Sequence, residues 1–120
     1  MVMLAVSGHR GLSDSTSRLV DAALRAELAR HDSIVGISCL ADGADQLFAQ
    51  AVLDVGGNLI VVVPADEYRQ DLPESCHDGY DRLFGQATKV VRLPHARSDS
   101  QAHMDASAAM LDLADQLVAV

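Results

Sequence analysis

Short runs of aliphatic residues alternate along the chain with longer segments of helical periodicity. The aliphatic runs cover residues 3–8, 34–40, 59–64, 89–94 and 116–120, and each is bounded by glycine, proline or aspartate. Three of these runs show little alternation of apolar and polar residues, as expected of strands that are buried on both faces. The pattern therefore predicts five β-strands.

The segments between the runs carry apolar residues at the spacing of amphipathic helices. Three stripes are present: Val20, Leu24 and Leu28; Leu47, Phe48, Ala51, Val52 and Val55; and Met104, Ala108 and Leu111. One of residues 13–15 is expected to cap the first helix, and the glycines at 56–57 to end the second. In residues 66–86, Pro73 and Gly79 interrupt the pattern. We expect a short turn and a loop there, followed by a helix through Tyr80, Leu83 and Phe84.

Strands that alternate with helices predict an α/β fold in which right-handed crossovers connect parallel strands. The expected architecture is a three-layer Rossmann-like fold with a mostly parallel five-stranded sheet. A chain of 120 residues, 49% of them hydrophobic, has material for one core, so we expect residues 1–120 to form a single domain. The apolar run 116–120 has no helix after it, and we expect the parent protein to continue with a glycine-rich turn and another helix.

Composition excludes several classes of partner. Nine basic and seventeen acidic residues give a net charge of −8, which disfavours nucleic acids and anionic membranes as partners. No apolar stretch approaches the roughly 18 residues of a membrane span.

The cysteines and histidines show no metal or redox motif. Cys39 and Cys76 are too far apart for a CxxC element, which indicates free thiols of a cytoplasmic protein. His77, His95 and His103 lack the spacing of a motif such as HExxH, so we expect no metal and no cofactor.

Two loops at the predicted carboxyl ends of strands contain residue types suited to a ligand. The first, Ser7-Gly8-His9-Arg10-Gly11, offers the forked guanidinium of Arg10 to a phosphate or carboxylate. In the second, Ala41-Asp42-Gly43-Ala44-Asp45, the glycine permits a positive φ or a close ligand contact before a helix N-terminus. The first two strands of such sheets are usually neighbours, so both loops should lie at one edge.

The same residues also have an interpretation without a ligand. Asp42 would be the N-cap of the following helix, with Asp45 in its first turn. The glycines would only turn the chain, and Arg10 would pair with a surface acid.

Three stretches of the sequence together resemble the SLOG superfamily, the Rossmann-like group that includes the LOG phosphoribohydrolases and the DprA proteins. They are SGHRG, SCLADGADQLFAQAVLDVGG and HMDASAAMLDLADQLVAV. The resemblance implies a pocket for a nucleotide or nucleotide-derived small molecule. The candidate ligand-binding residues are Ser7, Gly8, His9, Arg10, Asp42, Gly43 and Asp45, with Arg10 as an anion clamp and Asp45 as an acceptor for ribose or another polar group.

The chain also departs from that superfamily. The segment SDSQAHMDASAAM lacks the Arg-Lys pair of the LOG enzymes, and the chain ends where their PGGxGTxxE motif would begin. We therefore expect a sensor or partner module that forms a homo-oligomer. A LOG-like nucleoside-monophosphate phosphoribohydrolase that cleaves the N-glycosidic bond is the alternative, and a structural or oligomerising module is a third possibility.

Overall fold

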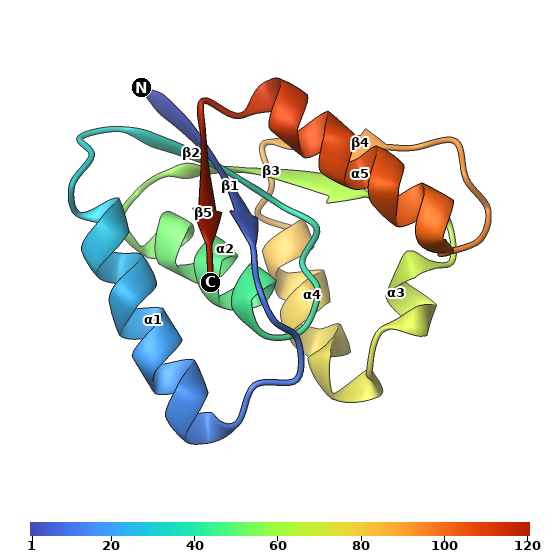
Figure 1. The fold of residues 1–120 in the computed structure, drawn as a ribbon, viewed down its shortest axis with the longest axis horizontal. Helices are drawn as coiled ribbons and strands as arrows, with labels where there is room; N and C mark the ends of the chain where they lie inside the picture. Colours follow the sequence, from blue (N-terminus) through green and yellow to red (C-terminus); the bar gives the residue numbers. More distant parts are fainter.

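The computed structural model describes residues 1–120 and has an open sheet of parallel strands at its centre (Figure 1). The strands are β1 (Val2–Ser7), β2 (Ile34–Ser38), β3 (Asn58–Val63), β4 (Lys89–Arg92) and β5 (Gln116–Ala119). They lie in the order β4-β3-β2-β1-β5, and every neighbouring pair is parallel. The predicted five-stranded parallel sheet is confirmed, and β5 is an edge strand.

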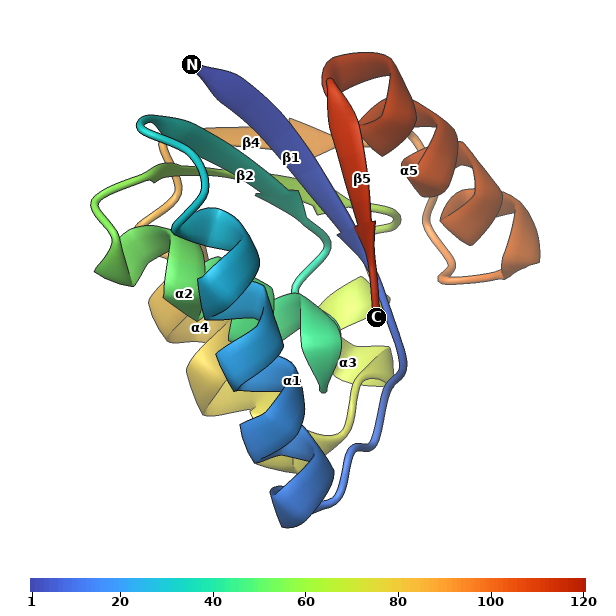
Figure 2. The same ribbon diagram turned by 60° about the vertical axis from the view of Figure 1, so that its left-hand side comes forward.

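Helices cover both faces of the sheet, which gives three layers (Figure 2). Helices α1 (Asp14–Leu28), α2 (Ala44–Asp54) and α4 (His77–Phe84) lie on one face, and α5 (Ser100–Leu113) alone covers the other. The connection from β3 to α4 contains the short helix α3 (Tyr68–Asp71) and the 3₁₀ turn η1 (Glu74–Cys76). The expected three-layer Rossmann-like architecture is therefore confirmed. None of these helices is long and apolar enough to cross a membrane.

The central strands β1, β2 and β3 are largely buried on both faces, as their continuous apolar runs predicted, whereas β4 and β5 are exposed or half-buried. In β1, Leu4 packs with α1 and α2, whereas its neighbour Ala5 packs toward α5. In β3, Val61 and Val62 divide between the two faces in the same way, and both are fully buried. Successive side chains of a strand point to opposite faces, so a strand covered by helices on both sides needs apolar residues at every position.

The ends of the first two helices follow the signals in the sequence. Ser13 caps α1 by accepting a hydrogen bond of 3.3 Å from the backbone N–H of Thr16. Helix α2 is followed by Gly56, whose φ of 82° only glycine adopts readily.

Helix α5 is rotated relative to the prediction. Its buried face consists of Ala102, Ala106 and Met110. The predicted stripe is exposed instead, with 65% of Met104 and 55% of Leu111 accessible to solvent. Both faces of this helix carry apolar residues, and the two alanines let its backbone approach the sheet closely. Packing against the sheet therefore decided the orientation.

A second correction concerns Gly79, which lies inside α4 and does not interrupt it. A Cβ at this position would come within 2.5 Å of Oε1 of Gln46 in α2. The Gln46 amide nitrogen donates hydrogen bonds to the carbonyl oxygens of Leu40 and Cys76, at 3.1 and 3.2 Å. Gly79 thus makes room for a side chain that ties α2 to the start of α4.

Candidate functional site

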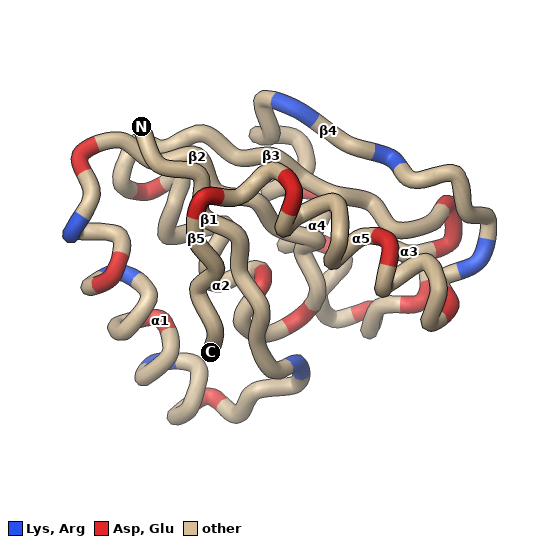
Figure 3. Tube along the Cα trace, turned by 45° about the horizontal axis from the view of Figure 1, so that its top comes forward, with Lys and Arg blue, Asp and Glu red and all other residues tan.

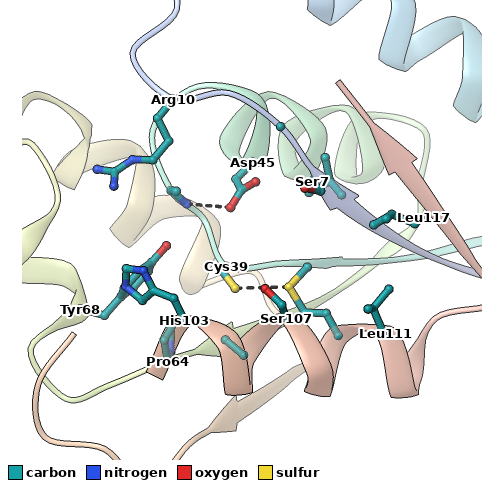
Figure 4. Close-up of a pocket in the computed structure, with 15 residues that line it drawn as sticks. Ser7, Arg10, Cys39, Asp45, Pro64, Tyr68, His103, Ser107, Leu111 and Leu117 are labelled. Atoms are coloured by element: carbon teal, nitrogen blue, oxygen red, sulfur yellow. Dashed lines mark hydrogen bonds between the residues drawn. The ribbon is translucent and has the colours of Figure 1, made fainter. Parts of the chain in front are cut away.

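A cavity of about 380 Å³ lies beyond the carboxyl ends of β1 and β2 (Figure 4). Its polar lining comprises Ser7, Arg10, Asp45, Tyr68, His103 and Ser107. Its apolar lining includes Cys39, Pro64, Met110, Leu111 and Leu117. In open α/β sheets, ligands bind outside the carboxyl ends of the strands, where the strand order reverses. This cavity has that position, because β2 and β5 flank β1 on opposite sides.

The two candidate loops are joined by hydrogen bonds. Strands β1 and β2 are neighbours, as predicted, so the loops leave the sheet side by side. The backbone N–H of Ala44 donates to the carbonyl oxygen of His9 at 3.1 Å. Arg10 Nε donates to Asp42 Oδ1 at 2.7 Å, and the N–H of Gly11 donates to the other carboxylate oxygen at 2.9 Å. Asp42 therefore connects the loops and does not cap α2.

The glycines at 8 and 43 serve this contact between the loops. Gly43 is the N-cap of α2 and has a φ of 87°. A Cβ on Gly43 would lie 2.5 Å from the His9 carbonyl oxygen, and one on Gly8 would collide with the Cβ of Ala44. Glycine is required at both positions because backbone and side-chain atoms of the opposite loop fill the adjacent space.

The β2–α2 turn contains a strained residue that a buried hydroxyl holds in place. Leu40 is fully buried and has a φ of 58°, which is unusual for a residue with a branched side chain. Ser38, also fully buried, accepts a hydrogen bond of 3.0 Å from the Leu40 N–H. Its hydroxyl in turn donates to the carbonyl oxygen of Asp45 at 3.1 Å. The turn is thus fixed relative to α2, and strain of this kind is concentrated at functional sites.

Asp45 is the acidic residue of the cavity. One of its carboxylate oxygens accepts a hydrogen bond of 3.3 Å from the Ala41 N–H, and the side chain forms no ion pair. Burial raises the pKa of Asp45 to about 6, with a small further rise from the charge of Asp42, while the Ala41 bond and Arg10 act in the opposite direction. The charge of Asp45 therefore changes close to neutral pH.

The wall opposite the loops comes from α3 and α5. The His103 ring packs edge-on against Tyr68, with ring centroids 6.0 Å apart, and its Nε2 lies 2.7 Å from the Ser98 hydroxyl. Nearer the sheet, the Cys39 thiol contacts the Met110 sulfur at 3.3 Å (Figure 4). Burial raises the pKa of the Cys39 thiol and of the Tyr68 phenol, so both stay protonated at neutral pH.

The candidate residues from the sequence fall into two groups. Ser7, Gly8, Arg10 and Asp45 line the cavity. Three others, His9, Asp42 and Gly43, lie where the loops meet; the His9 ring nitrogen Nδ1 is 3.0 Å from the Val120 carbonyl oxygen. Sequence reasoning missed Cys39, Tyr68, His103 and Ser107. No local signal marks these four, because they reach the cavity only through the packing of α3, α5 and β2.

Charge is distributed without a continuous basic surface. Figure 3 shows acidic positions spread over helices and loops, with basic positions lying singly among them. Arg10 is paired with Asp42, and Arg25 with Asp21 and Asp54.

Comparisons with known proteins identify similar folds. No protein-family model matches the chain, and no curated protein does. The X-ray structure of DNA processing protein A (DprA) from Streptococcus pneumoniae superposes with a TM-score of 0.73 at 18% sequence identity, over 98% of this chain and 41% of DprA. The X-ray structure of TM1055, a LOG-family protein, superposes with a TM-score of 0.66 at 19% identity, over 100% of this chain and 61% of TM1055.

These comparisons identify the fold and leave the function open. The chain shares the Rossmann-like α/β fold of these two proteins. It spans less than two thirds of the length of either matched protein.

Proposed function

We propose that this SLOG-like domain binds a nucleotide-derived small molecule in the cavity beyond β1 and β2. One observation carries the proposal. The loops that follow β1 and β2, together with α5, surround a cavity of about 380 Å³ at the carboxyl ends of the strands. Pockets for small molecules usually measure about 300–1,000 Å³ and combine apolar walls with a few polar groups, as this one does.

Arg10 is the residue that would attract the phosphate of such a ligand. Its side chain is 51% exposed, and only its Nε is bonded to Asp42, so the terminal guanidinium nitrogens remain available. A guanidinium suits phosphate because it presents several donors in one plane. The bond to Asp42 raises the pKa of Arg10, which is therefore always charged.

Calorimetric titration tests the proposal. Adenosine, guanosine, cytidine, uridine and their 5′-monophosphates are titrated into the wild-type protein, and at least one should bind. Arg10→Ala should weaken binding of the best monophosphate about tenfold, the loss of one charge-assisted hydrogen bond. Its melting temperature should stay nearly unchanged, because exposed ion pairs contribute little to stability.

Arg30→Ala is the matched control. Arg30 is also exposed and paired with an acid, Glu27, but it follows α1 and does not line the cavity. This variant should bind like the wild type. Equal binding by Arg10→Ala and wild type would show that Arg10 is not part of the site. Release of free base during the titrations, followed by chromatography, would favour the hydrolase alternative.

A further inference from the structure

Several of the groups expected to bind a phosphate between the loops already have protein partners. The N–H of Ala44, at the start of α2, is bonded to the His9 carbonyl oxygen. Arg10 Nε is bonded to Asp42, whose second oxygen is bonded to the Gly11 N–H. A phosphate at this junction would have to displace these contacts, so the space between the loops is not an open anion site.

Inside the cavity, the local charge disfavours an anion. Asp45 is the acidic residue of the lining, and its carboxylate is not neutralised by an ion pair. In Figure 4 it faces the cavity, and the Arg10 side chain extends away from it. Two negative charges repel each other more strongly where water is partly excluded. A phosphate is therefore disfavoured in the interior and is better placed at the exposed rim beside Arg10.

The same carboxylate is well suited to hydroxyl donors. An ionised carboxylate only accepts hydrogen bonds, and it has about four acceptor positions on two oxygens. The Ala41 N–H uses one of them, at 3.3 Å. The two vicinal hydroxyls of a ribose supply two donors close together, and an acid that binds ribose hydroxyls is a recurrent feature of Rossmann-type sites. Pro64, Met110 and Leu111 provide apolar surface for a base.

We infer that the cavity takes the nucleoside end of its ligand, with the ribose hydroxyls donating to the Asp45 carboxylate and any phosphate outside, beside Arg10. This inference rests on the proposed function and specifies the orientation and the ligand class. The site selects for a 2′,3′-diol, and a 5′-phosphate adds only a contact at the rim.

The orientation makes binding dependent on pH. Because the pKa of Asp45 is about 6, its carboxylate is fully ionised, and the strongest acceptor, only above that value. The groups around it are Arg10 and Asp42 from the loops, Cys39 from the end of β2, Tyr68 from α3 and His103 from α5. Arg10 stays charged, and Cys39 and Tyr68 stay neutral. The affinity for an uncharged nucleoside should therefore rise between pH 5 and pH 7.5.

The experiment compares three probes on the full chain: the best-binding nucleoside of the panel, its 2′,3′-dideoxy form and its 5′-monophosphate. Wild type should bind nucleoside and monophosphate within about tenfold of each other at pH 7.5, and the dideoxynucleoside at least tenfold more weakly. Asp45→Asn should lose about tenfold for the nucleoside, but nothing for the dideoxynucleoside, and should abolish the pH dependence. Asp14→Asn, in the exposed first turn of α1, is the control and should behave as wild type.

Each contrary result has one meaning. If Asp45→Asn binds the monophosphate more tightly than wild type does, the phosphate lies against Asp45; the inference is then wrong and the proposed function stands. Equal binding of nucleoside and dideoxynucleoside overturns the inference but not the proposed function. A pH dependence that persists in Asp45→Asn has the same meaning. If no nucleoside or monophosphate binds the wild type, both the proposed function and the inference fail.

Discussion

Two aspartates three residues apart have opposite energetic roles. Asp42 forms an ion pair with Arg10 and accepts the Gly11 N–H, so its charge is favourable in the folded protein. Asp45 is ionised in a cavity without an ion-pair partner, and its pKa of about 6 lies above the ordinary value of 3.8. An acid whose pKa is raised by folding binds protons more tightly in the folded state, so stability is lost as the pH rises from the unfolded pKa through the folded one.

This difference predicts the effect of Asp45→Asn on the free protein. Above pH 6 the variant should be more stable by up to about 2 kcal/mol, since a shift of one pKa unit corresponds to about 1.4 kcal/mol and partial solvent exposure reduces the effect. Near pH 4 the advantage should disappear, because wild-type Asp45 is then largely protonated in the folded state. Urea unfolding of both proteins at pH 4 and 7.5 measures the difference.

Asp42→Asn is the matched comparison, and it should lower the free energy of unfolding by about 1 kcal/mol, mainly because the charge-assisted bond from the Gly11 N–H is weakened, with a small part from the exposed Arg10 pair. Destabilisation by both substitutions would show that the Asp45 charge is not unfavourable in the folded protein.

At the scale of elements, the site depends on the contact between the β1–α1 loop and the start of α2. The positive-φ glycines Gly11 and Gly43 allow a test of that contact, because they differ in their surroundings. No atom lies within 4 Å of a Cβ placed on Gly11, whereas one on Gly43 would lie 2.5 Å from the His9 carbonyl oxygen. Gly11→Ala therefore introduces only an unfavourable backbone conformation, and Gly43→Ala adds a collision between two backbones.

We expect Gly11→Ala to cost about 1 kcal/mol, the usual penalty of a left-handed conformation for alanine. Gly43→Ala should cost at least about 2 kcal/mol more, because a φ of 87° with a ψ of −130° is essentially restricted to glycine and because the Ala44–His9 hydrogen bond is lost as the loops separate. Denaturant unfolding of the two variants provides the values. Equal losses would mean that the loops do not depend on close packing at Gly43.

At the scale of the whole molecule, β5 is an edge strand of the sheet within residues 1–120. A groove of about 470 Å³ between α1 and β5 is lined mostly by apolar residues, among them Val20 and Val118. On its α1 side, Leu19 is 73% exposed. An unpaired edge strand beside apolar surface favours pairing with another chain, and a two-fold axis is the simplest way to cover both copies at once.

We therefore expect a homodimer formed through this groove. Leu19→Lys should shift the equilibrium from dimer toward monomer, because the interface would bury the charged lysine against apolar surface. Met104→Lys is the control. It also replaces an exposed apolar residue by lysine, but Met104, which is 65% exposed, lies on α5 away from the groove, so the dimer should stay intact. Light scattering at micromolar concentration distinguishes the cases, and a monomeric wild type would contradict the prediction.

The sequence alone determined the elements and their order. Continuous apolar runs predicted strands buried on both faces, capping residues at 13–15 and glycines at 56–57 marked helix ends, and the alternation of strands with helices predicted the parallel sheet. These features depend on residues close together in the chain, whose conformational preferences and periodicity are visible in one dimension. The adjacency of the β1 and β2 loops followed from the same reasoning.

Only the tertiary structure decided which residues each side chain contacts. Asp42 is bonded to Arg10, 32 positions away, where local rules suggested a helix cap. Helix α5 buries Ala106 and exposes Met104, because close packing on the sheet favoured the smaller face. His103 reaches the cavity only through that orientation. Contacts of this kind depend on how helices and strands far apart in the sequence pack together, and an element with two apolar faces does not specify which one will be covered.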